Sequence, residues 1–393
     1  MIARTWKWTL GIIGSLVLAV LGNALSNRVE PFFAERRVPS AETFAWIFLG
    51  STITLATALT VTSRTLTQHK ERLLQRSKVH FIAFISASSG DGAFYSAILH
   101  QLILATRSTL TDCLLIVPWL PAESFDHADA LKEFRANPSA AGFSGVFVIP
   151  KDPDKERQTL ENLQHQMKIP VVVLDVFFDP SSKTEPSPLH FVGGNELEGG
   201  RIAGEIARDL IPPRSKPRVL ILVGRPTKWE MQRVQAFEAY LKEKLKLPSS
   251  CFTRSEYPLN YSRKNAADYM VRWLTQEALV TDRRIKLDIV FACNDDMALG
   301  AAEAIRAVKT APYNYTFVTA PQVIGYDGID TFKSAMREKD SMLAGTVDVN
   351  IREQATIAIE TMFDLVARTK AAGCPPAAPS SVNWPQMKKV VRP

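Results

Sequence analysis

Several apolar runs of the chain are followed directly by carboxylate or amide side chains. Asp175 follows the run VVVL, Asn294 opens the polar triplet after VFAC, and Asp327 lies in the turn GYDG. Such groups can form paired hydrogen bonds with neighbouring hydroxyl groups and thereby fix the orientation of a small ligand. These residues indicate a binding site for a polyhydroxylated molecule.

A cation and several aromatic rings complete this set of candidate ligand contacts. Arg233 lies in a helical stretch after VLILVG and can donate several hydrogen bonds, while Phe94 and Tyr95 can lay a ring against C–H bonds. The additional candidates are Asp91, Trp229 and Asp348. Together these types suit a carbohydrate-like ligand.

The same residues have structural explanations that the sequence leaves open. In the polar triplet we expect Asn294 to face the ligand and Asp295 or Asp296 to cap the helix that begins at Met297, although capping alone could explain the triplet. The other carboxylates could shape turns, Arg233 could be a solvated helix charge, and the aromatic rings could fill a core.

Catalytic and metal-binding sequence patterns are absent. The sequence has no GxSxG, P-loop or HExxH motif, and its six histidines show no metal-ligand spacing. The four cysteines form no CxxC pair and fit a reducing compartment. We therefore expect no enzyme, no metal and no cofactor; paired carboxylates leave a glycoside or nucleoside hydrolase as the enzymatic alternative.

From residue 79 onward, short apolar runs alternate with amphipathic stretches of helical length. The expected strands are Val79–Ile85, Cys113–Val117, Val146–Ile149, Val171–Leu174, Val219–Val223, Ile289–Cys293, Val323–Tyr326 and Lys389–Arg392. The expected helices include Phe94–Thr106, Lys155–Met167, Arg201–Leu210, Met231–Leu245 and Met297–Val308. This alternation predicts an α/β protein with parallel sheets covered on both faces, and its length favours two lobes. Ligands of such sheets bind beyond the carboxyl ends of the strands, where the candidate residues lie.

Four segments resemble type I periplasmic sugar-binding proteins and the related effector domains of lac-repressor-type regulators. They read IPVVVLD followed by FVGGNELEGGRIAGEIA, then VFACNDDMALGAAEAI, VIGYDGID and GTVDVNIREQATIAIE. The resemblance runs from about Val79 to the C-terminus. It implies two Rossmann-like lobes joined by three crossing segments, with the ligand trapped between the lobes by hinge closure.

Ligand contacts of that family map onto most of the candidates. The resemblance implies an aromatic pair at Phe94 and Tyr95, and it implies polar contacts at Asp175, Arg233, Asn294 and Asp327. Two positions depart from the pattern, because Val176 stands where an arginine is usual and Val349, beside Asp348, stands where a glutamine is usual. These departures argue against a ribose-like ligand and favour a less hydroxylated or larger one.

The resemblance also divides the chain. We expect residues 79–193 plus about 346–372 in the first lobe and residues 194–345 plus about 373–393 in the second. Residues 1–78 precede both lobes and contain ten Lys or Arg against four Glu. They carry most of the chain's net charge of +7, so the rest of the chain is nearly neutral. Nucleic-acid binding is therefore not expected.

Two uncharged stretches in residues 1–78 predict a membrane hairpin, at about residues 8–27 and 43–63. The first could instead be a cleaved signal peptide. Seven flanking cations on the side of both ends, against three in the loop, favour a cytoplasmic domain held at the inner membrane by two helices, with a periplasmic domain as the alternative.

The expected function is therefore that of a membrane-anchored, non-catalytic ligand sensor for a sugar, nucleoside or polyol, acting by hinge closure on a signalling partner. The alternative is the substrate-binding component of an ABC sugar importer, with a transporter as the partner protein.

Overall fold

The computed structural model of the chain describes residues 79–86, 93–106, 113–118, 127–175, 189–213, 215–311, 315–373 and 385–392. Apart from Val79, these residues belong to one compact unit, His80–Pro393. The predicted membrane hairpin lies outside the described residues, as do Asp91 and Val176. Within the described ranges, no helix combines the length and apolar character that crossing a bilayer requires.

The first lobe is a five-stranded sheet with the strand order β2-β1-β3-β4-β5. Its strands are β1 (Val79–Ser86), β2 (Cys113–Pro118), β3 (Gly145–Ile149), β4 (Val171–Leu174) and β5 (His190–Val192), and β1, β3, β4 and β5 pair in parallel. Its helices are α3 (Ala93–Thr106), α4 (His127–Ala136) and α5 (Pro153–His165), joined by α11 (Ile351–Ala372) from late in the chain.

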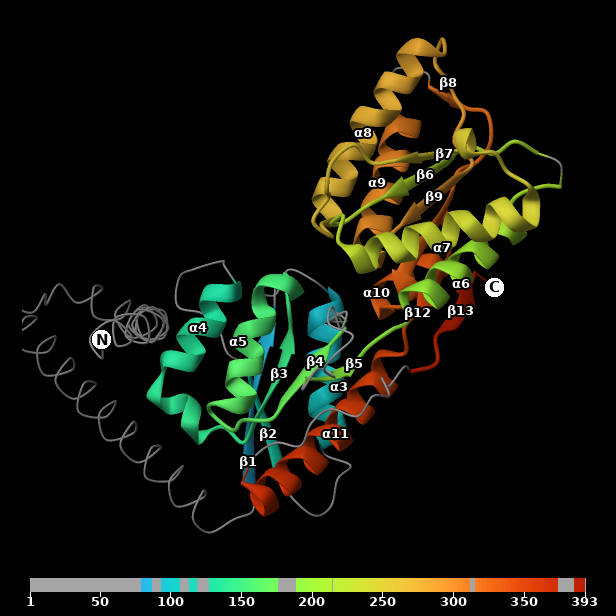
Figure 1. Cartoon of the computed structure of the whole chain (residues 1–393). Coiled ribbons are helices and arrows are strands. Elements are labelled where there is room, and N and C mark those ends of the chain that lie inside the picture. The colour runs from blue at the N-terminus through green and yellow to red at the C-terminus, as the bar shows by residue number, and fades with distance from the viewer. Residues whose placement is uncertain are drawn as a thin grey trace, which may run out of the picture. The chain divides into compact units, whose positions relative to one another are not determined.

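Alternate residues of the central strands face opposite layers of helices. Val146 and Val148 of β3 belong to the cluster under α4 and α5, whereas Phe147 and Ile149 belong to the cluster under α3 and α11. Figure 1 shows these helix pairs on opposite faces of the sheet. Because both faces are buried, the strands are apolar at every position, as the sequence pattern predicted.

The second lobe is a six-stranded sheet with the order β13-β12-β11-β9-β6-β7. Its strands are β6 (Val219–Leu222), β7 (Phe252–Arg254), β9 (Ile289–Ala292), β11 (Gln322–Asp327), β12 (Leu343–Asp348) and β13 (Lys388–Val391), of which only the edge strand β13 is antiparallel to its neighbour. Two short strands, β8 (Arg284–Ile285) and β10 (Thr316–Phe317), form a separate parallel ribbon. The helices are α6 (Glu196–Leu210), α7 (Lys228–Leu245), α8 (Arg263–Val280), α9 (Asp295–Thr310) and α10 (Asp330–Met336). In Figure 1, α6 and α7 cover one face of the sheet and α8 and α9 the other.

Glycine allows α6 to approach α7 closely, which positions the arginine of α7. A Cβ atom added at Gly200 would lie 2.2 Å from the carbonyl oxygen of Arg233, and one at Gly204 would lie 2.8 Å from the ring of Tyr240. Neither position tolerates a side chain without movement of the neighbouring helix. The spacing of these two glycines therefore fixes where Arg233 lies relative to the start of α6.

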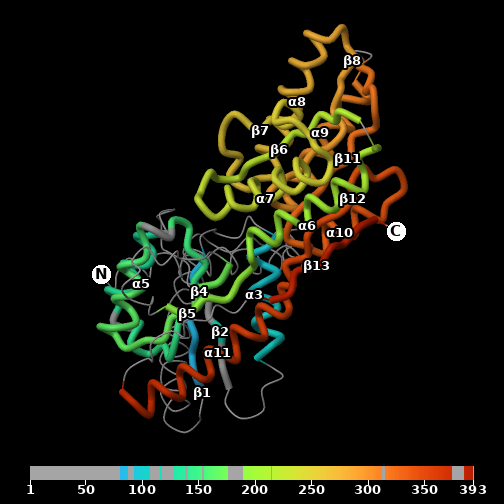
Figure 2. The backbone as a smooth tube through the Cα atoms, turned by 45° about the vertical axis from the view of Figure 1, so that its right-hand side comes forward, coloured from blue at the N-terminus to red at the C-terminus, as the bar shows by residue number. Residues whose placement is uncertain are grey.

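The chain passes between the lobes three times, and Figure 2 shows the first two crossings, from β5 to α6 and from β12 to α11. It leaves β5 for α6, leaves β12 for α11, and returns from α11 to β13. Residues 346–348, which we expected to begin the return to the first lobe, still pair with β11 and β13. The second crossing therefore follows Asp348, because the strand continues for as long as it has partners on both sides.

Candidate functional site

The carboxyl ends of β4 and β11 each carry an aspartate with a positive φ angle. Asp175 has φ 67° and Asp327 has φ 117°. Aspartate enters the left-handed region more readily than most residues, but the φ of Asp327 lies well beyond its usual range. Strained backbone of this kind is concentrated at functional sites, where it aims a side chain in a direction that regular structure does not allow.

Arg233 of α7 forms a buried ion pair with Glu196, the first residue of α6. Its Nε donates to Glu196 Oε2 over 2.6 Å, and the two side chains are only 5% and 9% exposed. The guanidinium lies over the ring of Tyr326 with Cζ 3.4 Å from the centroid, and it also donates to the carbonyl oxygen of Cys293. The positive charge of Arg233 is therefore balanced by a residue of the chain itself.

The side chains at the strand ends influence one another across the two lobes. Burial raises the pKa of Asp175 to about 7, with repulsion from Glu196 adding to the rise and Arg233 opposing it. Burial likewise raises the pKa of Asp327, with repulsion from Asp295 and Asp175 in addition. Asp175 belongs to the first lobe and the other residues to the second, so the charges of the two lobes influence one another.

Two of these carboxylates lack hydrogen-bond partners within the described part of the chain. No donor reaches the side chain of Asp175 or of Asp327, although Asp327 is only 9% exposed. A buried carboxylate without a partner is costly, because water no longer solvates it. Such acceptors are suited to donors that arrive with a ligand.

Aromatic rings lie beside these acids. Burial raises the pKa of the Tyr95 hydroxyl, as does repulsion from Asp175 and, to a lesser degree, Asp327. Tyr261 and Trp229 stack with their centroids 6.4 Å apart and their planes 12° apart, and the Tyr261 hydroxyl donates to Glu230 over 2.6 Å. Burial raises the pKa of Tyr261, with repulsion from Glu230 and, to a lesser degree, Tyr95 adding to the rise. The Nε1 of Trp229 is buried without a partner within the described residues.

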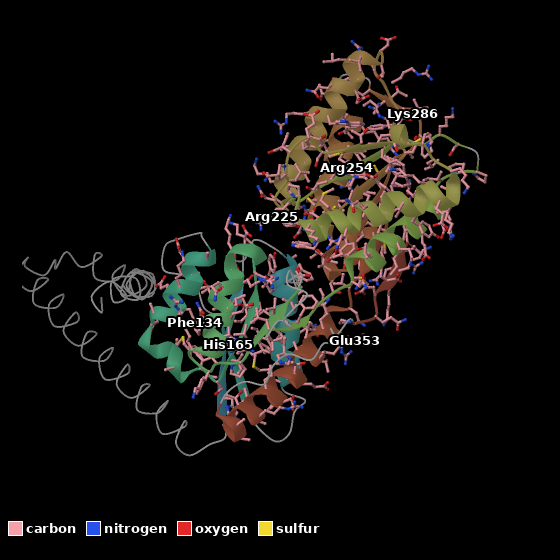
Figure 3. All side chains as sticks on the ribbon, in the orientation of Figure 1. Phe134, His165, Arg225, Arg254, Lys286 and Glu353 are labelled. Carbon is pink, nitrogen blue, oxygen red and sulfur yellow. The ribbon has the colours of Figure 1, made fainter. Side chains whose placement is uncertain are left out.

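Arg225 adds a second cation to this region. It lies in the loop between β6 and α7 and is labelled in Figure 3, with its guanidinium carbon 5.5 Å from the centroid of Tyr261. Arg225 lowers the pKa of Tyr95.

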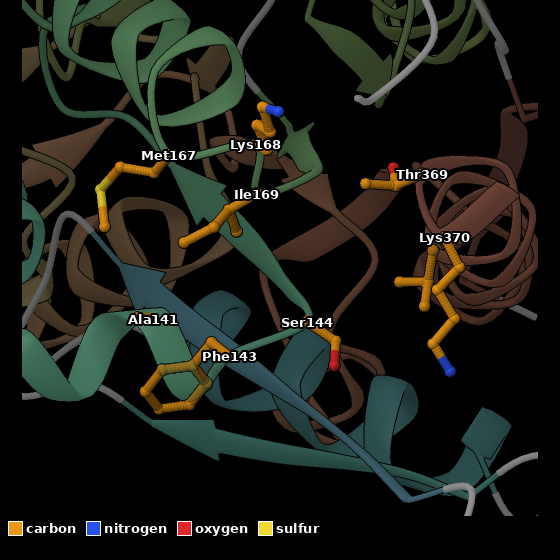
Figure 4. Close-up of a pocket in the computed structure, with 9 residues that line it drawn as sticks. Ala141, Phe143, Ser144, Met167, Lys168, Ile169, Thr369 and Lys370 are labelled. Carbon is orange, nitrogen blue, oxygen red and sulfur yellow. The ribbon is translucent and has the colours of Figure 1, made fainter. Parts of the chain in front are cut away.

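A cavity of about 370 Å³ lies at the opposite end of the first sheet (Figure 4). Its lining includes Ser144, Lys168 and Lys370, next to the residues that begin β3 and β4. A second hollow of about 280 Å³ lies over the edge strand β13, where Asp209 and Lys389 line it. Neither is lined by the residues at the carboxyl strand ends. The candidate site therefore depends on those side chains and not on the two cavities.

A family model described as the periplasmic binding protein domain matches residues 82–370, which is more than half of the chain. The chain belongs to the periplasmic binding protein family. This membership confirms the resemblance seen in the sequence. Among curated relatives, a protein of Rhizobium meliloti named for rhizopine binding is 26% identical over 55% of this chain, and the ribose import binding protein of Salmonella typhimurium is 26% identical over 51%. The matched regions span 62% and 58% of those relatives' own lengths.

Solved structures show the same fold. A periplasmic solute-binding protein from Actinobacillus succinogenes with bound D-allose has a TM-score of 0.61 at 18% identity, covering 80% of this chain and 97% of that one. A solute-binding protein from Agrobacterium vitis with bound D-fucose also has a TM-score of 0.61 at 18% identity, covering 79% of this chain and 95% of that one. The α/β fold with two Rossmann-like lobes is confirmed. The family model and both curated relatives are named as binding proteins, which supports the prediction that this periplasmic binding protein is not an enzyme.

The polar triplet of this periplasmic binding protein works differently from our expectation. Asn294 itself caps α9, because its Oδ1 accepts from the backbone N of Met297 over 2.9 Å, and its Nδ2 donates to the Tyr261 carbonyl over 3.3 Å. The prediction that Asp295 or Asp296 forms the cap was wrong. The backbone of Asn294 is extended at φ −153°, which is the conformation that lets a side chain reach the first free N–H groups of a helix.

The two acids of the triplet serve elsewhere. Asp295 is fully buried and accepts from Thr346 Oγ1 over 2.7 Å and from the backbone N of Ile329 over 2.8 Å, which ties α9 to β12 and to the loop after β11. Asp296 accepts from the backbone N of Ala93 over 3.2 Å. Because Ala93 begins α3 of the first lobe, this hydrogen bond joins the two lobes directly.

The remaining candidates divide into core, paired and site residues. Phe94 is 7% exposed and belongs to the core of the first lobe, while its neighbour Tyr95 is half-buried. Asp348 pairs with Lys333 over 2.7 Å and accepts from the backbone of Asn350, so its oxygens are engaged. Val349 is 3% exposed and packs in the core.

Glu196, Tyr326 and Tyr261 were not among the candidates predicted from the sequence. Glu196 comes shortly after β5, at the start of a helix. Asp175 was selected because it follows an apolar strand, and the same criterion would have selected Glu196. The expected helix began at Arg201, five residues later than α6 does, so Glu196 was not considered as the start of a helix. Tyr326 was counted as a strand residue, and nothing in its neighbours distinguishes it from a core aromatic.

Proposed function

We propose that this chain binds one small carbohydrate-type ligand between its lobes and delivers it to an ABC importer. The observation that carries the proposal is that Asp175 of the first lobe and Asp327 of the second both end buried strands with a positive φ, and that neither side chain has a partner within the described residues. Arg233 acts electrostatically on both of them. The relatives support it, since one is named for ribose import and solved structures of the same fold hold D-allose and D-fucose.

Hinge closure follows from the three crossings. Ligand contacts on both lobes favour the closed arrangement, because only closure completes the set of hydrogen bonds. Tyr95 and Trp229 would lie against the C–H surface of the ligand while the acids and Arg233 bind its polar groups. Asn294 keeps one amide hydrogen for this purpose after its capping and backbone contacts.

Calorimetry on the purified full-length chain with a panel of pentoses, hexoses, amino sugars, nucleosides and polyols tests the binding function. We expect at least one compound to bind, and we expect Asp175→Asn to weaken its binding at least about tenfold. Asp364→Asn, on the exposed surface of α11, is the matched control and should leave the affinity unchanged. If no compound binds, or if both variants bind as the wild type does, the proposal is wrong.

The transport role places the domain in the periplasm, where members of the family usually act. A reporter fused to the C-terminus tests this location, and periplasmic activity of the reporter is expected. Deletion of the gene should then abolish uptake of the ligand found by calorimetry. A cytoplasmic reporter signal would favour instead the membrane-anchored sensor, which the two uncharged stretches in residues 1–78 support.

A further inference from the structure

The cavity at the amino ends of β3 and β4 has an apolar and a polar part. It measures about 370 Å³, and Figure 4 shows it between the sheet and α11. The apolar part of its lining consists of Ala141, Phe143, Met167, Ile169 and Val366, and the polar part of Ser144, Lys168, Thr369 and Lys370. Among the described residues of this lining, none is acidic. Every charge that they bring to the cavity is therefore positive.

Two polar residues of the lining are joined through His80 of β1. Nζ of Lys370 lies 2.9 Å from Nε2 of His80, and Nδ1 of His80 lies 3.0 Å from Oγ of Ser144. An ammonium group only donates hydrogen bonds, which assigns the acceptor role to Nε2 and the ring hydrogen to Nδ1. His80 is 5% exposed. It therefore holds Ser144 at the start of β3 and Lys370 of α11 in fixed places beside the cavity.

This arrangement leaves hydrogen-bond donors beside the cavity. Ser144 accepts from His80 and keeps its own O–H to donate, and Lys370 keeps two of its three N–H groups after one is bound to His80. Lys168 and Lys370 form no ion pair within the described ranges. The Thr369 hydroxyl, by contrast, donates to a carbonyl of its own helix over 2.6 Å. The cavity thus offers donors and positive charge to an acceptor that is negatively charged.

We propose that this cavity binds a small organic acid. The carboxylate is held by Ser144, Lys168 and Lys370, and the apolar body of the acid packs against Phe143 and Met167. Hydrogen bonds from an ammonium to a carboxylate are roughly twice as strong as those between neutral groups. A volume of about 370 Å³ lies near the lower end of the range for small-molecule pockets, so the acid is small.

The apolar part of the lining distinguishes an organic acid from other ligands. Inorganic phosphate has oxygen atoms on all sides, and those that face Met167, Ile169 and Val366 would lose their water without gaining a donor. The hydroxyl groups of a neutral sugar would meet the same apolar side chains, and a sugar brings no negative charge to the two lysines. A carboxylate on an apolar body satisfies both parts of the lining.

This cavity is separate from the candidate site at the carboxyl strand ends. It lies where β4 begins, whereas Asp175 follows the last residue of the same strand. Binding of an organic acid therefore does not depend on the proposed sugar-binding function. One ligand could be held at each end of the first sheet.

Pairs of compounds that differ in charge test the proposal. Hexanoate with hexanamide, benzoate with benzamide, and phenylacetate with phenylacetamide are titrated into the full-length chain at pH 7 by calorimetry. The acid of each pair is ionised at this pH, and its amide has nearly the same shape without the charge. We expect at least one acid to bind about tenfold or more tightly than its amide. Absence of binding by all three acids, or equal binding of acid and amide in every pair, overturns the proposal.

Lysine variants assign the binding to this cavity. The double variant Lys168→Gln and Lys370→Gln should weaken binding of the acid at least about fivefold and change binding of the amide less than about twofold. Both lysines are exposed, so the variant should fold, and thermal melting checks this. Lys264→Gln, at an exposed lysine of α8, is the matched control and should change neither affinity. If the double variant binds the acid as tightly as the wild type does, the acid binds elsewhere and the proposal is wrong.

Discussion

The guanidinium of Arg233 lies over the ring of Tyr326, with Cζ 3.4 Å from the ring centroid, while the hydroxyl of the same tyrosine donates to Glu196 over 3.3 Å. The three side chains thus form a closed set in which each contacts the other two. Gly199 makes room for it, because a Cβ atom there would lie 2.1 Å from the Tyr326 hydroxyl. Arg233 is therefore held in place before any ligand arrives.

Removal of Arg233 should destabilise the protein as well as weaken binding. Arg233→Ala leaves Glu196 buried without a counter-charge, and we expect a loss of about 3 to 5 kcal/mol in the free energy of unfolding. Urea denaturation measures it. Adding Glu196→Gln to Arg233→Ala should recover a large part of the loss. If the single variant is as stable as the wild type, the ion pair contributes nothing and our account of it is wrong.

Protonation of Asp175 should make stability depend on pH. Its pKa of about 7 in the folded protein lies above that of an unfolded aspartate near 4, so the folded state binds the proton more tightly. This group therefore favours folding at low pH, and its contribution is lost as pH rises from about 4 to about 7. Asp175→Asn should remove the loss and stabilise the protein at pH 8 by on the order of 1 to 2 kcal/mol.

Urea denaturation of the wild type and Asp175→Asn at pH 4 and pH 8 measures this dependence. The gain from the substitution should be present at pH 8 and close to zero at pH 4, where Asp175 is protonated in the folded wild type and about half protonated in the unfolded chain. Asp364→Asn, an exposed aspartate, should show no such difference. An equal increase in the free energy of unfolding at pH 4 and at pH 8 would mean that the pKa of Asp175 is not raised in the folded protein.

Asp295 should be a stability residue and not a ligand contact. Asp295→Ala removes the acceptor for Thr346 and for the backbone of Ile329, both buried, and we expect a loss of about 2 to 4 kcal/mol. Thr346→Val should cost about 1 to 2 kcal/mol. Asp268→Ala, whose carboxylate is exposed, is the control. Urea denaturation reports the stability, and a variant of normal stability with lost ligand affinity would reverse this assignment.

The close packing of α6 on α7 should be sensitive to one added methyl group. Gly200→Ala would place a Cβ 2.2 Å from a backbone oxygen of α7, and we expect a loss of about 1 to 3 kcal/mol together with weaker ligand binding, because Arg233 shifts with its helix. Gly142→Ala is the matched control, since no atom lies within 4 Å of its added Cβ. Thermal melting and calorimetry test the two variants, and equal behaviour would contradict the packing argument.

Much of the fold follows from the sequence because both faces of each central strand are buried. The runs VVVL and VFAC are apolar at every position, and their lengths match β4 and β9 closely. Helix α8 was not among the helices expected from the sequence. Its surface mixes Trp273 and Met270 with many charges, so its apolar face is narrow and the pattern weak.

The site was harder to predict than the fold. Asp175 and Asp327 were predicted as ligand contacts because each directly follows a buried strand, and this role stays a prediction. The roles of Asn294, Asp295 and Asp296 could not be separated, since three adjacent polar residues compete for one cap and the backbone angle of Asn294 decides. Phe94 and Tyr95 are neighbours on one helix, yet only tertiary packing shows which of them enters the core.

The hydrogen bond from Ala93 to Asp296 also has a kinetic consequence. It spans the two lobes without a ligand, so we expect it to slow the opening of the lobes. A change that shortens the side chain at position 296 should therefore speed release of the proposed ligand more than its binding. The first turn of α9 would then determine how long a ligand stays bound, while the residues at the strand ends determine how tightly it binds.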